Sequence, residues 1–153
     1  MSVWEALWTG VTRDWQEFPT LARATQIIMR LFWAALLGGL LGFERELTGK
    51  AAGMRTHMLV ALGAALFAVV PEEFGGTTAD TSRVVQGLAA GVGFLGAGSI
   101  IKLPEDRRIK GLTTAAGIWL TSAIGVAVGV GRLGIALICT ILALVVLSVL
   151  PAV

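Results

Sequence analysis

The chain has 153 residues, of which 56% are hydrophobic and only 14% are charged, and its formal net charge is +2. Soluble domains carry about 25% charged residues, so this composition excludes a domain whose whole surface faces water. The length and composition together predict a single domain embedded in a membrane.

Residues 1–24 are predicted to form an amphipathic segment at the membrane interface. Large apolar side chains recur there at helical spacing, namely Trp4, Leu7, Trp8, Val11, Trp15 and Phe18. A helix of this kind can lie along a bilayer surface, where tryptophan is favoured. The alternative is an N-terminal arm docked on the rest of the protein. The segment has no secretory cleavage pattern, so we expect it to be retained.

Five apolar segments follow, and most approach the roughly 20 residues that a helix needs to cross the hydrocarbon core of a bilayer. They cover residues 25–43, 56–70, 84–101, 112–130 and 133–150. Lipid offers backbone groups no hydrogen-bond partner, so each segment is predicted to be a helix. The connections are short. Residues 25–153 are therefore expected to form an all-α, polytopic bundle of about five transmembrane helices.

The stretch GVGFLGAG, residues 91–98, contains the letters of the dinucleotide-binding motif. That motif lies between a strand and a helix and has an acidic residue about 20 positions further on. Here it lies inside an apolar segment, and position 116 is alanine. We interpret the glycines as helix-packing residues, because small residues four positions apart let membrane helices approach closely. This spacing occurs at Gly38, Gly42, Gly87, Gly91, Gly93, Ala97, Gly125 and Gly129. The third segment is expected at the crowded centre of the bundle.

The basic residues indicate an orientation. The loops after the first and third segments carry Arg45, Lys50, Arg55, Lys102, Arg107, Arg108 and Lys110, and the opposite side carries fewer. Positive loops remain in the cytoplasm, so the N-terminus is predicted outside and the C-terminus in the cytoplasm. The basic residues form no continuous stripe, so no nucleic acid binding is expected.

The chain has one cysteine, Cys139, and one histidine, His57. We interpret Cys139 as a packing residue. His57 is interpreted as a structural hydrogen-bonding group, with ligand binding or proton handling as the alternative. No nucleophile and base are arranged for catalysis, so neither enzymatic activity nor a cofactor is expected.

Charged residues at the segment ends are the functional candidates, because a charge at membrane depth is costly unless it is paired or hydrated. One group lies where the first segment meets the second and includes Glu44, Arg45, Arg55, Thr56 and His57. A carboxylate and a guanidinium paired there would fix the hairpin. Alternatively, Glu44 and Arg55 border a cytoplasmic vestibule for an ion or a lipid headgroup.

The second group lies at the opposite boundary. Asp80 or Ser82 can cap the third helix, and Arg83 can pair with Asp80 one turn away. Arg83 and Gln86 point to a buried polar site, since a polar group among small residues needs a partner from another helix. On the cytoplasmic side, Thr113 and Thr114 begin the fourth segment; they are further candidates for a ligand or coupling site, or their hydroxyls bond back to the preceding turn.

The signal for magnesium is weak. Magnesium takes oxygen ligands in octahedral geometry, usually from one or two carboxylates and several waters. The segments themselves contain no Asp or Glu, and Glu44 and Asp80 lie at opposite boundaries. A channel lined by carboxylates is therefore disfavoured, and no metal site is assigned. A path lined by carbonyl groups stays open.

Three stretches of the chain are distinctive when taken together: LLGGLLGFERELTGKAAGMRTHMLVALGAALF (36–67), DTSRVVQGLAAGVGFLGAGSII (80–101) and IKGLTTAAGIWLTSAIGVAVGVG (109–131). In this order they resemble the hydrophobic domain of the MgtC/SapB family of bacterial membrane proteins. The resemblance implies a multi-pass inner-membrane protein involved in survival at low magnesium and, in pathogens, in virulence. Family members have also been linked to the F-type ATP synthase. Longer members add a soluble C-terminal domain after the fifth span, so we expect this sequence to be either a short member or a part of a longer chain.

Together these features predict a homo-oligomeric, non-enzymatic regulator that acts through other membrane proteins, such as ATP synthase or P-type ATPases. The alternative is a transporter or channel for magnesium, another ion or a small solute, with Asp80 and Arg83 near one gate. A third reading is an assembly scaffold that binds no ligand.

Overall fold

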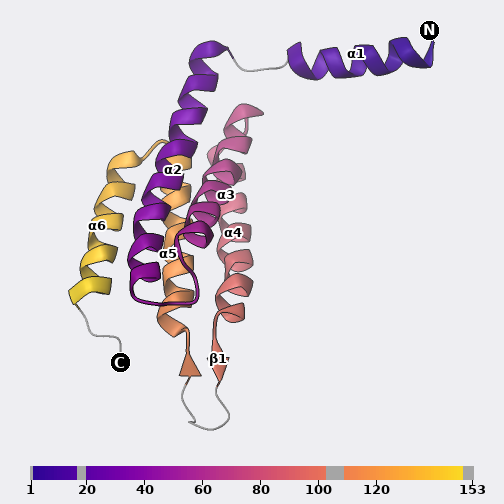
Figure 1. The fold of residues 1–153 in the computed structure, drawn as a ribbon. Coiled ribbons are helices and arrows are strands. Elements are labelled where there is room, and N and C mark those ends of the chain that lie inside the picture. Colours follow the sequence, from indigo (N-terminus) through magenta and orange to yellow (C-terminus); the bar gives the residue numbers. More distant parts are fainter. Residues whose placement is uncertain (1, 17–19, 103–108, 150–153) are drawn as a thin grey trace.

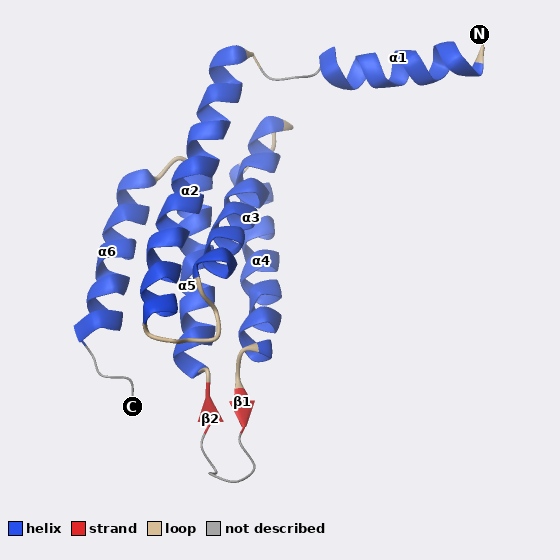
Figure 2. Ribbon diagram, viewed as in Figure 1, coloured by secondary structure: helices blue, strands red, loops and turns tan. Residues whose placement is uncertain are grey.

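The computed structural model describes residues 2–16, 20–102 and 109–149, and it shows a helical bundle with a short β-ribbon (Figures 1 and 2). The helices are α1 (Val3–Gln16), α2 (Leu21–Leu47), α3 (Met54–Glu73), α4 (Thr78–Gly98), α5 (Leu112–Gly129) and α6 (Leu133–Val149). The strands are β1 (Ile101–Lys102) and β2 (Ile109–Lys110). Helices α2 to α6 correspond to the five predicted apolar segments, so the predicted all-α membrane bundle is confirmed.

Length and composition support a membrane location. Helices α2, α3 and α5 are each long and apolar enough to cross a bilayer. Helix α2 has 27 residues, which corresponds to roughly 40 Å at the usual helical rise, more than the hydrocarbon core requires. Helix α6 is apolar but shorter, at 17 residues. Helix α4 is long enough but less apolar than these three helices, because Arg83, Gln86 and several glycines lower its mean hydropathy.

The core lies between α2, α3 and α5, with α6 on one flank and α4 on the other (Figure 1). Its buried side chains are small or of medium size and include Ala34, Leu37, Leu41, Ala61, Ala65, Ile124 and Val128. Small side chains let the helices approach until backbone meets backbone. The three central helices therefore gain van der Waals packing, which drives helix association in lipid.

Glycines make the closest of these contacts. A β-carbon on Gly38 of α2 would lie 2.6 Å from the carbonyl oxygen of His57 in α3, and one on Gly129 of α5 would lie 2.6 Å from that of Ala65. Gly42 and Gly125 are equally crowded against α3. Helix α3 is therefore clamped between α2 and α5 at positions where only glycine fits.

Helix α4 lies at the edge of the bundle, so the expectation that it forms the crowded centre is wrong. Its buried residues are Val92 and Gly96. Gly87, Gly91 and Gly93 have no atom of another helix within reach of an added β-carbon, and Ala97 is exposed. Glycine spacing identifies a surface that allows close approach, but it does not say which helix lies opposite. Residues 91–98, which contain the letters G-x-G-x-x-G, all lie inside this one helix and so do not form a phosphate-binding loop.

The two ends of the bundle differ. The loop between α2 and α3 and the β-ribbon lie at one end, here called the ribbon end (Figure 1). Helix α1 and the α3–α4 and α5–α6 connections lie at the other, here called the α1 end. This arrangement confirms that the loops after the first and third segments share a side. The ribbon was not predicted: α4 ends at Gly98, and Ile101 pairs with Lys110.

Gly111 allows the chain to pass from the ribbon into α5. Its φ angle is +94°, a left-handed conformation that favours glycine. A β-carbon at this position would also collide with the carbonyl oxygen of Ser99. The residues 103–108 between the strands, including Arg107 and Arg108, lie outside the described part of the chain.

Helix α1 extends sideways away from the α1 end of the bundle, at a large angle to α2 (Figure 1). A reciprocal pair of hydrogen bonds begins it, because Ser2 N donates to Glu5 Oε2 and Glu5 N donates to Ser2 Oγ. Trp4, Leu7 and Trp8 are exposed. This leaves an apolar face available to a bilayer surface, as the interfacial reading requires. Phe18 of the predicted stripe lies outside the described residues.

Candidate functional site

A buried charge lies at the ribbon end. Arg45 is in the last turn of α2 and is only 3% exposed. Its Nη1 lies 3.8 Å from Oε2 of Glu44, and its Nη2 donates a long hydrogen bond of 3.4 Å to Oγ1 of Thr114 in α5. Its Nε has no partner. A buried guanidinium normally has short, complete contacts, so this charge is only partly compensated.

Two further buried polar atoms lie near Arg45. Within the described part of the chain, Oε2 of Glu44 accepts no hydrogen bond and Nε2 of His57 has no hydrogen-bond partner. His57 itself is 1% exposed, in the first turn of α3. The structure therefore brings Glu44, Arg45, His57 and Thr114 together, as their positions at the segment ends suggested. This group is called the ribbon-end cluster below.

Other predicted candidates at this end lie apart from the cluster. Arg55 and Thr56 are exposed in the first turn of α3, and within the described residues no ion pair joins Glu44 to Arg55. The hairpin is instead fixed by Glu46, whose Oε2 accepts a hydrogen bond of 3.0 Å from the backbone N–H of Met54. The carboxylate thus satisfies one of the backbone donors at the start of α3. Thr113 is exposed beside the buried Thr114.

At the α1 end, Asp80 is part of a cap. Thr77 is the N-cap of α4: its hydroxyl and backbone N–H both donate to Oδ2 of Asp80, at 2.7 and 2.8 Å, and Asp80 N donates back to the hydroxyl at 3.4 Å. Asp80 or Ser82 had been expected as the cap itself. The hydroxyl of Thr77, followed by its N–H, holds the pKa of Asp80 below its usual value. Asp80 precedes the predicted span 84–101.

Arg83 and Gln86 do not form the buried polar site that the sequence suggested. Arg83 pairs with Asp80 at 3.0 Å, as expected for residues one turn apart, but its side chain is 76% exposed. Gln86 is exposed as well. Both follow from the position of α4 at the edge of the bundle, where no helix of this chain covers that face.

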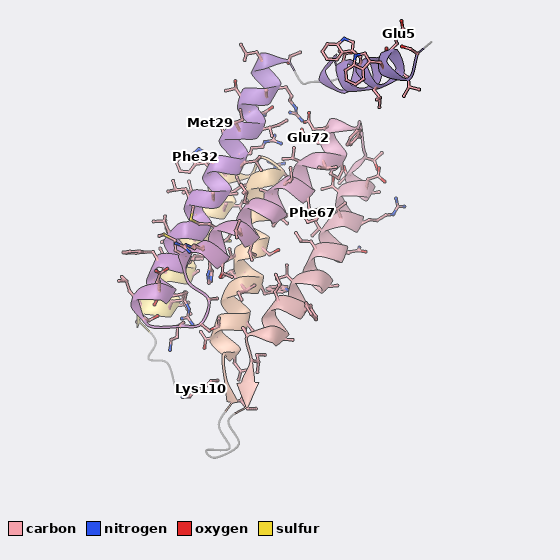
Figure 3. All side chains as sticks on the ribbon, turned by 45° about the vertical axis from the view of Figure 1, so that its right-hand side comes forward. Glu5, Met29, Phe32, Phe67, Glu72 and Lys110 are labelled. Carbon is pink, nitrogen blue, oxygen red and sulfur yellow. The ribbon has the colours of Figure 1, made fainter. Side chains whose placement is uncertain are left out.

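Sequence reasoning missed a charged cluster that joins α2 to α3 at the α1 end. Arg30 Nη1 lies 2.7 Å from Oε2 of Glu72, and Arg23 Nη2 lies 3.0 Å from Oε1 of Glu72 and 2.6 Å from Oε1 of Glu73. Figure 3 shows Glu72 near the top of the bundle between these helices. Arg30 was visible as a charge inside an apolar segment. Its partner follows only from the antiparallel register that Gly38 and Gly42 set between α2 and α3.

The described residues contain no group of three or more His, Cys, Asp and Glu side chains that could hold a metal ion. The chemistry that the ribbon-end cluster offers is therefore hydrogen bonding and charge compensation. It can respond to a partner or a ligand that completes the contacts of Arg45, Glu44 or His57.

Comparison with known proteins gives one family. The model of the MgtC family matches residues 31–153. Protein SrpB of Synechococcus elongatus is 46% identical over 130 residues, covering 78% of this chain and 71% of SrpB. YhiD of Escherichia coli strain K12, whose name marks it as a candidate magnesium transporter, is 40% identical over 131 residues, covering 81% of this chain and 60% of YhiD. No solved structure gives a significant match.

Protein MgtC of Brucella abortus is 45% identical over 108 residues, covering 71% of this chain. The match spans only 44% of that relative, so the chain corresponds to less than half of it. What these longer relatives do as whole proteins is therefore not carried over by the match itself.

Proposed function

The chain belongs to the MgtC family, and on that premise we propose that it is a non-enzymatic regulator in a bacterial inner membrane. In this role it supports growth at low magnesium, and in a pathogen virulence, through contacts with other membrane proteins. The relatives named MgtC and the magnesium-related name of YhiD support the connection with magnesium. The ATP synthase and P-type ATPases are the partner class implied by the family resemblance.

The observation that carries a regulatory role over transport is the closed interior of the bundle. Gly38, Gly125 and Gly129 bring α2 and α5 against the backbone of α3 along its length. A hydrated divalent cation crossing one chain would need a path lined by oxygen atoms between these helices. The contacts at Ala61 and Ala65 occupy that space with backbone and methyl groups.

The outer surface supports contact with partners in the membrane. Large apolar side chains are exposed on several helices, among them Phe32 on α2, Phe67 on α3, Phe94 on α4 and Trp119 on α5. Figure 3 shows Phe32 and Phe67 on the bundle. Surfaces of this composition are suited to lipid and to other transmembrane helices.

Flux through sealed liposomes tests this proposal against the transporter alternative. Purified protein is reconstituted in liposomes that contain a magnesium-sensitive dye, and we expect the same leak as in empty liposomes. Flux that depends on protein and disappears in Asp80→Asn or Arg83→Ala would establish the transporter. The second arm adds F-type ATP synthase to the same liposomes. A regulator changes ATP-driven proton pumping, whereas a scaffold that binds no ligand changes neither the magnesium flux nor the proton pumping.

We also propose that the α1 end lies outside the cell membrane and the ribbon end in the cytoplasm, and cysteine labelling tests this orientation. In a Cys139→Ala background, a cysteine at Phe74 on the α1 end should react with a membrane-impermeant maleimide in intact spheroplasts. A cysteine at Ala51 on the ribbon end should react only after lysis. Both side chains are exposed, so accessibility within the fold does not distinguish them. The reverse labelling pattern would place the ribbon end outside.

A further inference from the structure

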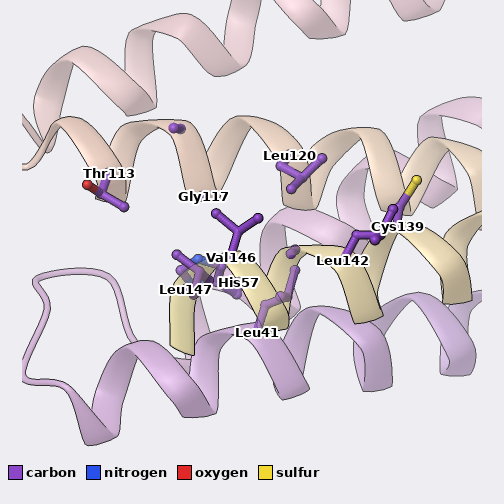
Figure 4. Close-up of a pocket in the computed structure, with 11 residues that line it drawn as sticks. Leu41, His57, Thr113, Gly117, Leu120, Cys139, Leu142, Val146 and Leu147 are labelled. Atoms are coloured by element: carbon purple, nitrogen blue, oxygen red, sulfur yellow. The ribbon is translucent and has the colours of Figure 1, made fainter. Parts of the chain in front are cut away.

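A cavity of about 340 Å³ lies between α5 and α6, with α2 and α3 behind it (Figure 4). Its walls are mostly apolar side chains, including Leu41, Leu120, Leu142, Val146 and Leu147. Leu142 and Val146 are also exposed on the outside of the bundle, so the cavity can be reached from the lipid side. An apolar cavity of about 150 Å³ already holds benzene, so this one has room for a larger apolar group.

The polar side chains that line the cavity are those of His57, Thr113 and Cys139, and His57 is the most deeply buried of them. Nδ1 of His57 lies 3.0 Å from the carbonyl oxygen of Gly53. A carbonyl oxygen only accepts hydrogen bonds, so Nδ1 of the neutral ring carries the hydrogen and Nε2 keeps its lone pair. Nε2 is buried and has no hydrogen-bond partner among the residues that the structure describes.

A glycine beside the ring keeps Nε2 of His57 accessible from the cavity. Gly117 of α5 also lines the cavity, and a β-carbon added there would lie 3.5 Å from Nε2 and near nothing else. Figure 4 shows His57 beside Gly117, Val146 and Leu147. A water molecule is a poor occupant here, because a buried water needs about two to four polar partners and these walls are mostly apolar.

We propose that this cavity binds a neutral, membrane-soluble amphiphile whose hydroxyl group donates a hydrogen bond to Nε2 of His57. An ionised ligand is excluded, because no Asp, Glu, Lys or Arg is among the lining residues to compensate its charge. An acyl or alkyl chain matches the apolar walls and the opening toward lipid. Two sources carry this chemistry: a free long-chain alcohol and the hydroxyl of a glycerolipid.

The only histidine of the chain makes the test direct. The protein is labelled with ¹⁵N-histidine and placed in nanodiscs of phosphatidylcholine, which has no hydroxyl donor. It is then titrated with 1-dodecanol, with 1,2-dioctanoylglycerol, or with dodecyl methyl ether, which keeps the chain and lacks the donor. The hydroxyl compounds should move the Nε2 resonance and bind roughly three- to tenfold more tightly than the ether, the factor that one net hydrogen bond supplies.

Two variants separate cavity binding from general partition into lipid. Gly117→Ala places a methyl group against Nε2 and should reduce binding of 1-dodecanol to the level of the ether. Val146→Phe fills the cavity and should weaken both compounds. Its matched control is Val145→Phe, because Val145 is the adjacent residue of α6, is similarly exposed and does not line the cavity.

The hydroxyl compound with the lower Kd identifies the source of the ligand. An Nε2 resonance that neither hydroxyl compound moves, or that the ether moves equally, overturns the proposal. A resonance that responds only to the protein-to-lipid ratio assigns the cavity to a second copy of the chain, which also overturns it. If Gly117→Ala binds 1-dodecanol as the wild type does, the hydrogen bond to His57 is refuted.

Discussion

Arg30 of α2 donates a hydrogen bond of 2.9 Å from Nη1 to the backbone carbonyl of Gly129, in the last turn of α5. The carbonyls of a helix's last turn lack partners within the helix and carry its negative dipole end. The same nitrogen also contacts Glu72 of α3 at 2.7 Å. One guanidinium therefore joins the three central helices at the α1 end.

Removing this guanidinium should loosen the α1 end. We expect Arg30→Gln to destabilise the protein by about 1–3 kcal/mol, because the carbonyl of Gly129 and Oε2 of Glu72 both lose the contact with Arg30. Arg30→Lys should recover part of this loss. Thermal unfolding in detergent measures the effect, and Arg132→Gln serves as the control, since Arg132 is an exposed arginine at the same end. Equal Tm values for the two glutamine variants would contradict the joining role.

Glycine substitutions should separate the tightly packed helices from the open one. Gly38→Ala would place a methyl group 2.6 Å from the carbonyl oxygen of His57, and overpacking of this kind costs about 1–3 kcal/mol. Gly87→Ala meets open space within the chain, and replacing a helical glycine there should be neutral or add up to about 1 kcal/mol. The free energies of unfolding in detergent micelles test both. A stable Gly38→Ala protein would show that α2 and α3 are not locked together there.

The helices could be predicted from the sequence because the features that determine them lie within each segment. Apolar length and the need to satisfy backbone hydrogen bonds decide where a membrane helix lies, and both can be read from one segment. The environment of each glycine could not be read in this way. Gly38 and Gly87 have the same small-residue spacing, but only Gly38 faces another helix of the chain.

The sites show the same division between local and long-range information. The Asp80–Arg83 pair was predicted, because residues three apart on a helix are neighbours. The cluster of Arg23, Arg30, Glu72 and Glu73 joins positions more than 40 residues apart and needs the register of the α2–α3 hairpin. The burial of Arg45 likewise depends on where α5 lies.

The cap of α4 should make stability depend on pH in acid. Hydrogen bonds from Thr77 lower the pKa of Asp80 in the folded protein, whereas the unfolded chain keeps the ordinary value of about 3.9. The carboxylate therefore stabilises the fold at pH values above the ordinary pKa. This contribution disappears as the pH falls through the lowered pKa of the folded protein. Asp80→Asn should have a lower Tm than the wild type at pH 6, and the difference should shrink toward pH 2. A difference that is constant over this range would show that the carboxylate charge contributes nothing.

Arg45 allows stability and function to be separated. Arg45→Met alone would leave the buried Oε2 of Glu44 without its counter-ion, which costs about 3–5 kcal/mol. Replacing a whole buried ion pair by uncharged residues of similar size is often neutral or stabilising, so the double variant Glu44→Gln, Arg45→Met should have a free energy of unfolding within about 1 kcal/mol of the wild type. If the ribbon-end cluster serves the proposed regulation, the same variant should fail to restore growth at limiting magnesium in a deletion strain. Arg55→Met, at an exposed position nearby, should restore it. Full complementation by the double variant would reduce the cluster to a packing feature.

The exposed face of α4 provides the test for the proposed homo-oligomer. Gly87 and Gly91 lie four residues apart and have open space above them in one chain, the spacing at which two membrane helices can approach closely. If copies of the chain meet there, Gly91→Leu should reduce the fraction of oligomer and leave the free energy of unfolding of the monomer unchanged. Gly134→Leu is the matched control, because Gly134 in α6 is equally open. Native mass spectrometry from nanodiscs gives the subunit number. An oligomer that survives Gly91→Leu, or that Gly134→Leu disrupts to the same degree, would exclude α4 as the contact between subunits.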